Sequence, residues 1–307
     1  MKYVAWAFHQ NQILGDELSE NEFARALMDR KLILQNIEAE ETFRALLDNY
    51  AELESALLSI GQDYTLIGHL GHIRAMSHRL LLDRRYANFL STCRLYINFA
   101  DSAVKNQGGS QEFEHQTHRE YDRSLGYRVM EALRNYVQHR GFPLERITYT
   151  ERAAGNVQDG IGEIRIIPGL AINRLRTDDK FKKKVFHEIE SLTAPPDLRP
   201  WTREYVDGLR RCHGVLITQM SSGLDDAISR YAKATQRFAD RIPIEGLIVR
   251  YEKRDEDNRV LEELAFTDEL IELLKMLKSD NKIRRDIAGT FVSNDSRKPL
   301  GSQNDPS

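Results

Sequence analysis

The sequence predicts a mainly α-helical protein with two small β-hairpins. Apolar residues recur at steps of three or four through most of the first 140 residues and again over residues 200–238, as they do on one face of a helix. Two later regions instead contain short runs that alternate between apolar and polar residues, which is the pattern of strands. Glycine and proline stand at the borders of these patterns and mark turns.

In the N-terminal region the pattern predicts helices up to the first glycine-rich break. Residues 16–60 are expected to form one long helix or two shorter ones, ending at Gly61. The glycine-broken run 64–71 is expected to be a loop or a short helix. From Leu82 to Val104 apolar residues follow at alternating steps of four and three, which indicates an amphipathic helix.

A turn at residues 106–110 is expected to lead into the next helix. Ser110 can cap that helix, because a serine hydroxyl satisfies the free amides of a first turn. The helix is expected to run from about Gln111 to His139, where Gly141-Phe142-Pro143 ends it.

The second half mixes strands and helices. The first hairpin is expected to pair residues 146–150 with 162–167 around a turn at Ala154-Gly155-Asn156, and the second to pair 246–251 with 260–266. Helices are expected at 180–192, from Pro200 to a break near Gly223 with a continuation towards 238, and at 268–277 after a capping Thr267. Residues 293–307 are rich in Ser, Asn, Asp, Gly and Pro, so we expect a disordered tail.

Composition limits the possible functions. The 307 residues allow one or two domains, and a net charge of -3 excludes a generally basic nucleic-acid coat while leaving local basic patches possible. Two cysteines are too few for a disulfide framework, which indicates a reducing compartment. No apolar run approaches the roughly 20 residues that cross a bilayer, so we expect a cytoplasmic protein without membrane contact.

The segment Arg134-Asn135-Tyr136-Val137-Gln138-His139 carries the strongest chemical signal. Arginine offers a permanent cation and histidine titrates near neutrality, and both are useful around a phosphodiester. Asn135 and His139 stand at i and i+4 on one helix face, where the amide could fix the histidine tautomer. A plain helix end would also favour Arg and His, because both complement the helix dipole. At such an end, truncating either residue is expected to cost no more than about 1 kcal/mol.

This segment, with the helix before it and the Gly-Phe-Pro break behind it, resembles the HEPN superfamily. The family signature is an arginine, a polar residue that is often asparagine, and a histidine after a total gap of four to six residues. Residues 81–96 resemble the preceding helix of uncharacterised bacterial HEPN proteins, and the resemblance covers about Leu80 to Pro143. It implies a helical domain over residues 1–145 that forms a homodimer with the two motifs facing each other, followed by a mixed extension over 146–292.

The resemblance implies metal-independent cleavage of RNA, in which a ribose 2′-OH attacks the adjacent phosphorus. His139 would move the proton and Arg134 would hold the phosphate, with Arg94 and Asn98 on the facing helix as further substrate-binding residues. The reaction needs no metal and no cofactor. Regulation by AMP transfer is put in doubt, because Gly141 stands where regulated family members carry a tyrosine.

Other polar segments give weaker signals. The pairs His69/His72 and His115/His118 lack the third and fourth ligands of a metal site. The basic segments 182–184 and 210–211 could attract an RNA backbone, although solvated faces are the default interpretation.

The sequence thus favours an RNA endonuclease, acting as a toxin or in bacterial antiviral defence, with a possible antitoxin or defence-system partner. The alternative is a catalytically inactive HEPN-like scaffold that binds a protein or nucleic-acid partner. Fold and catalysis are separate questions, because one fold can carry a site or lack it.

Overall fold

The computed structural model describes residues 1–10, 12–67, 71–106, 111–153, 162–243 and 247–282. Its mainly helical character, with small antiparallel sheets, confirms the fold class at that level. The chain divides into two compact units, each assembled from separate segments. Unit 1 comprises Met1–Arg44, Phe99–Gly109 and His213–Lys282, and unit 2 comprises Ala45–Asn98, Ser110–Cys212 and Ile283–Ser307. The boundary expected at residue 145 stays a prediction.

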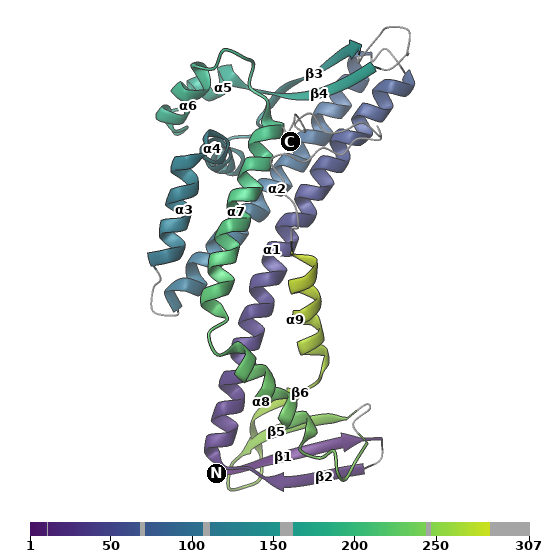
Figure 1. Cartoon of the computed structure of the whole chain (residues 1–307), viewed down its shortest axis with the longest axis vertical. Helices are drawn as coiled ribbons and strands as arrows, with labels where there is room; N and C mark the ends of the chain where they lie inside the picture. The colour runs from purple at the N-terminus through teal and green to yellow at the C-terminus, as the bar shows by residue number, and fades with distance from the viewer. Residues whose placement is uncertain (11, 68–70, 107–110, 154–161, 244–246, 283–307) are drawn as a thin grey trace, which may run out of the picture. The chain divides into compact units, whose positions relative to one another are not determined.

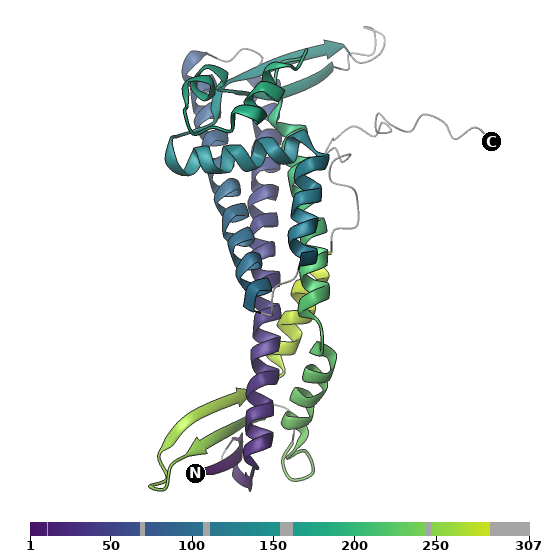
Figure 2. The same cartoon turned by 90° about the vertical axis from the view of Figure 1, so that its left-hand side faces the viewer.

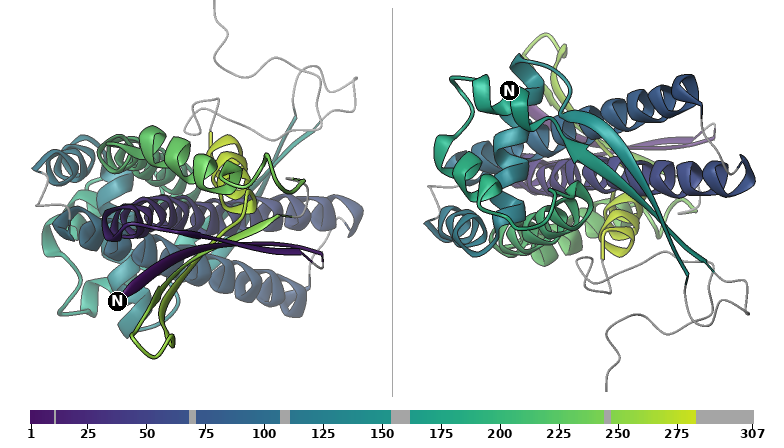
Figure 3. Two further views of the ribbon diagram at one scale, coloured as in Figure 1. Left: turned by 90° about the horizontal axis from the view of Figure 1, so that it is seen from below. Right: turned by 90° about the horizontal axis from the view of Figure 1, so that it is seen from above.

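Unit 1 contains a four-stranded antiparallel sheet in the order β2-β1-β5-β6 (Figure 1). Its strands are β1 (Lys2–His9), β2 (Gln12–Glu17), β5 (Ile248–Arg254) and β6 (Val260–Phe266). The second predicted hairpin is therefore half of a larger sheet, and the N-terminal strands went unpredicted. Strands from the two ends of the described chain lie side by side, as the view from below shows (Figure 3).

The inner face of this sheet forms the core of unit 1. Ala5, Ala7, Val249, Tyr251 and Phe266 are all less than 10% exposed and belong to one buried cluster with residues of three helices. Those helices are α1 (Glu20–Ile67), of which residues up to Arg44 belong to this unit, α8 (Leu224–Gln236) and α9 (Glu269–Asp280). Alternating side chains on the other face of β1 are larger and only half-buried.

Helix α1 differs from the predicted helix at both ends. It begins at Glu20 because Ser19 and Glu22 form a capping box: the Glu22 amide donates to the Ser19 hydroxyl (3.2 Å), and the Ser19 amide donates to the Glu22 carboxylate (2.8 Å). It also continues through Gly61 to Ile67, because one glycine costs a helix only about 1 kcal/mol. The expected stop at Gly61 is wrong.

Unit 2 is built from helices and one two-stranded hairpin. Its helices are the C-terminal part of α1, most of α2 (His72–Asn106), α3 (Gln111–Arg123), α4 (Leu125–His139), α5 (Ile172–Thr177), α6 (Lys183–Glu190) and α7 (Leu198–Met220) up to Cys212. The helix predicted around residues 82–104 is confirmed as α2, which runs alongside α1 (Figure 2) with Tyr50 and Phe89 6.2 Å apart. The hairpin pairs β3 (Leu144–Ala153) with β4 (Gly162–Leu170), as predicted.

The expected single helix from Gln111 to His139 is two helices. Ser124 has an extended backbone (φ -127, ψ 125), and its hydroxyl accepts a hydrogen bond from the Tyr127 amide at 3.1 Å. A serine that caps α4 in this way ends the preceding helix, because its own backbone has left the helical region.

The remaining differences concern helix ends. Helix α9 starts after Asp268 rather than at a cap formed by Thr267, and α5 was not predicted. Helix α7 begins two residues before Pro200, which the first turn tolerates because its amides have no helical acceptor. The break near Gly223 is confirmed, with Gly223 at φ +74. Ser110, the turn at 154–156 and the tail from residue 293 lie outside the described residues.

Helices α4 and α7 approach unusually closely at two glycines. A Cβ atom on Gly126 of α4 would lie 2.8 Å from the Cα of Trp201, and one on Gly208 of α7 would lie 2.6 Å from the Tyr127 ring. The contact distance between these helices therefore depends on the absence of side chains at both positions.

We expect Gly126→Ala to lower the free energy of unfolding by about 1–3 kcal/mol, because the new methyl group overpacks against a backbone that cannot yield easily. Gly214→Ala, in helix α7, is the control. No atom lies within 4 Å of its added Cβ, so this change should stabilise by about 0.5–1 kcal/mol. Urea denaturation followed by circular dichroism measures both. Equal midpoints for the two variants would contradict the close-packing interpretation.

Candidate functional site

The predicted motif lies on α4, but its arginine faces the interior of unit 2. Arg134 is 5% exposed and lies on the buried face of the helix, which also carries Tyr127, Met130 and Leu133. Its guanidinium bonds Glu131 one turn earlier, with Nη1 3.0 Å from Oε1 and Nη2 2.8 Å from Oε2. This is a two-point ion pair of the kind that fixes both side chains.

A second helix completes this polar group. The Tyr205 hydroxyl of α7 donates to Glu131 Oε1 at 2.6 Å, and the Tyr205 ring packs edge-on against Tyr127 at 4.8 Å. We call Glu131, Arg134 and Tyr205 the buried triad. Glu131 Oε1 accepts hydrogen bonds from Arg134 and Tyr205, and Oε2 lies 2.8 Å from Arg134 Nη2, whereas the Arg134 Nε atom is buried without a hydrogen-bond partner among the described residues.

The electrostatics keep Arg134 charged. Burial opposes the charge, but the neighbouring Tyr205 and Glu131 groups outweigh it and raise the pKa of Arg134 above its ordinary value. Burial also raises the pKa of the Cys93 thiol on α2, with Glu131 adding to this effect and Arg134 opposing it. Helices α4 and α7 therefore meet at the buried triad, and Cys93 of α2 lies within its electrostatic influence.

His139 is the last residue of α4 and is exposed, as is Asn135. Five residues of helix turn a side chain through about 140°, so Arg134 and His139 project in different directions. Within one chain the structure does not bring the two together. Asn135 and His139 share an exposed face as predicted, and among the described residues neither side chain makes a hydrogen bond.

The helix end beside His139 is sharply defined. The Arg140 amide donates to the Tyr136 carbonyl at 2.8 Å, and Gly141 has φ +147, a conformation that favours glycine. Exposed Asn98 and half-buried Arg94 lie on α2, off its buried stripe. Of the α2 residues, Cys93 is one on whose pKa Arg134 acts electrostatically.

Of the basic segments singled out from the sequence, Arg210-Arg211 is paired with carboxylates, whereas Lys182-Lys183-Lys184 is exposed. Arg211 donates to both Glu120 oxygens, at 2.7 and 2.6 Å, and also pairs with Asp207. The Lys182 ammonium lies 4.7 Å from the centre of the Tyr121 ring. Within the described residues, no three His, Cys, Asp or Glu side chains are placed to hold a metal ion.

Sequence reasoning missed Glu131 and Tyr205. The spacing Tyr127, Met130, Arg134 is i, i+3, i+7, which places the arginine on the apolar face, and Glu131 stands at i-3 from it. These spacings were readable and indicate a buried ion pair. Tyr205 is 74 residues from Glu131, and no local pattern links them.

No protein-family model matches the chain, and neither a curated protein nor a solved structure is significantly similar to it. No helix within the described ranges is both long and apolar enough to cross a bilayer.

Arg134→Ala should lower the free energy of unfolding by about 3–5 kcal/mol, because it leaves the Glu131 carboxylate, whose side chain is only 15% exposed, with Tyr205 as its one remaining partner among the described residues. This corrects the expectation that either truncation at the motif would be mild. His139→Ala, at an exposed position of the same helix, should change stability by no more than about 0.5 kcal/mol. Urea denaturation of the two variants and the parent measures the difference, and a mild effect of Arg134→Ala would argue against the buried triad.

Alkaline pH should lower the free energy of unfolding through the ionisation of Tyr205. Burial, reinforced by the Glu131 charge, raises the pKa of Tyr205 well above its ordinary value near 10. The unfolded chain therefore releases this proton first, so the stability contribution is complete below about pH 10 and is lost as the pH rises above it. We expect the urea midpoint to fall less steeply between pH 9 and 11 in Tyr205→Phe than in the parent. An equal fall of the urea midpoint with pH in the two proteins would contradict the raised pKa of Tyr205.

Proposed function

We propose that this chain is a HEPN-like binding scaffold of the cytoplasm in which Arg134 stabilises the helical bundle. The observation that carries the proposal is the burial of Arg134 in its two-point pair with Glu131. A phosphate clamp needs a cation that reaches the ligand, and a guanidinium already paired inside a core cannot serve without leaving its partner.

Two further observations support the scaffold. The Tyr205 hydroxyl holds the Glu131 carboxylate from a second helix, so the pair is fixed at both ends. Both cysteines are free and buried, as suits a reducing compartment.

A second candidate function is a metal-independent RNA endonuclease of the toxin or antiviral-defence kind. The exposed face of Asn135 and His139 at a sharply ended helix favours it, together with the motif resemblance. In that reaction His139 would take the proton of a ribose 2′-OH as the oxygen attacks phosphorus, leaving a 2′,3′-cyclic phosphate and a 5′-OH. The phosphate would then be held by a homodimer partner or by a repositioned Arg134. An antitoxin or defence-system protein would restrain such an enzyme.

A cleavage assay separates the two functions. Purified protein is incubated with a mixture of structured and single-stranded RNA in EDTA, using the parent, His139→Ala and the control His118→Ala, an exposed histidine on α3. Under the scaffold proposal, all three proteins leave the RNA intact.

Cleavage in EDTA that falls at least about a hundredfold in His139→Ala, the lower end for losing a general acid or base, would establish the endonuclease instead. His118→Ala should then match the parent. Growth of cells expressing each protein provides a second readout, since an active toxin arrests growth and its His139→Ala variant does not.

A further inference from the structure

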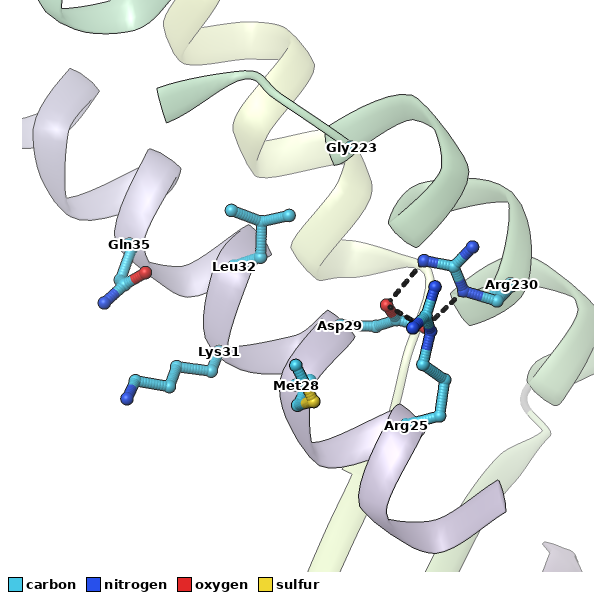
Figure 4. Close-up of a pocket in the computed structure, with 8 residues that line it drawn as sticks. All are labelled: Arg25, Met28, Asp29, Lys31, Leu32, Gln35, Gly223 and Arg230. Atoms are coloured by element: carbon cyan, nitrogen blue, oxygen red, sulfur yellow. Dashed lines mark hydrogen bonds and ion pairs between the residues drawn. The ribbon is translucent and has the colours of Figure 1, made fainter. Parts of the chain in front are cut away.

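An open groove lies between the N-terminal part of α1 and the start of α8, within unit 1 (Figure 4). Its volume is about 760 Å³. The lining residues are Arg25, Met28, Asp29, Lys31, Leu32 and Gln35 of α1, and Gly223 and Arg230 beside or on α8.

Positive charge exceeds negative charge along the groove. Its one lining carboxylate, Asp29, accepts two hydrogen bonds from Arg230 at 2.7 and 2.8 Å and lies 3.8 Å from Arg25. Lys31 makes no ion pair with any described residue. Asp226 lies one turn before Arg230 and is not a lining residue, and its negative charge helps to raise the pKa of Arg230. The lining therefore carries three cations and one buried carboxylate, with a further carboxylate, Asp226, beside it.

The floor of the groove is apolar and partly open to solvent. Met28 is 64% exposed, although its side chain is apolar, and Leu32 beside it is half-buried. Methionine is flexible and polarisable, so it adapts to the surface of a partner. An apolar strip between cations suits a ligand with apolar and acidic faces.

We propose that this groove docks an acidic amphipathic helix of a partner protein, an inference that rests on the proposed scaffold function. The lining of α1 spans residues 25–35, about 15 Å at 1.5 Å per residue, which matches roughly three turns of a docked helix. Leucine-type side chains of the ligand pack on Met28 and Leu32, and its carboxylates face Arg25, Lys31 and Arg230. Single-stranded nucleic acid fits less well, because such sites stack bases on aromatic rings and the described lining contains none.

The test uses a synthetic 20-residue peptide with leucines on one helical face and glutamates on the other. Its controls are a scrambled isomer, which loses the amphipathic face, and a version with lysine in place of glutamate. Binding is measured by fluorescence anisotropy against the full chain, at low and at 0.5 M salt.

The groove variant is Met28→Asp with Lys31→Glu, both at exposed positions. The matched control is Met276→Asp with Lys275→Glu, which makes the same changes on the exposed face of α9. We expect the groove variant to weaken binding of the acidic peptide at least tenfold and the control variant to leave it unchanged. The scrambled and lysine peptides should bind at least tenfold more weakly, and salt should weaken the acidic peptide.

Several outcomes would overturn the proposal: no binding of the acidic peptide, equal binding of its scrambled isomer, or equal losses in the groove and control variants. Displacement of the peptide by a 20-nucleotide single-stranded RNA, with RNA binding lost in the groove variant, would assign the groove to nucleic acid instead. Circular dichroism of both variants confirms that they are folded. RNA cleavage by the parent would defeat the scaffold function but leaves peptide binding separately measurable.

Discussion

The Arg134–Glu131 ion pair is the constraint on which the centre of unit 2 depends. Burying two charges costs several kcal/mol for each ion, and only good geometry with further hydrogen bonds repays it. The pair meets this condition because two guanidinium nitrogens reach the carboxylate and the Tyr205 hydroxyl adds a third donor. The positions of α4 and α7 are thereby coupled, since displacement of either helix breaks a bond to a buried charge.

The close approach of α4 and α7 at Gly126 and Gly208 also fixes the positions of these two helices. Side chains at these positions would push α7 away from α4. Along α7, Tyr205 lies between Trp201, which is next to Gly126, and Gly208, which is next to Tyr127. Small residues thus set the distance between the helices and the polar contact sets their alignment. Arg134 is thus part of the contact that joins α4 to α7.

Much of this architecture was predictable where side-chain periodicity was strong. The stripe from Leu82 to Val104 predicted α2, because one uninterrupted apolar face admits no other element of that length. The Ser124 break was missed because no proline marks it, and only the cap geometry reveals two helices. Strand β1 was missed because small buried Ala5 and Ala7 alternate with apolar Val4, Trp6 and Phe8, so the strand shows no alternation in polarity. At the candidate site, the face of Arg134 was readable from its spacing, but its contact with Tyr205 depends on tertiary packing.

The sheet of unit 1 also has a consequence for the order of events during synthesis. Strand β1 pairs with β5 along its whole length, from Lys2 opposite Arg254 to Phe8 opposite Ile248. At 5–20 residues per second, a ribosome needs roughly 12–50 s to make the intervening chain, so the first hairpin waits that long with one edge unpaired. An apolar strand edge can recruit strands of other molecules during such a delay. Until β5 is made, the nascent β1–β2 hairpin therefore exposes a strand edge that a chaperone can protect.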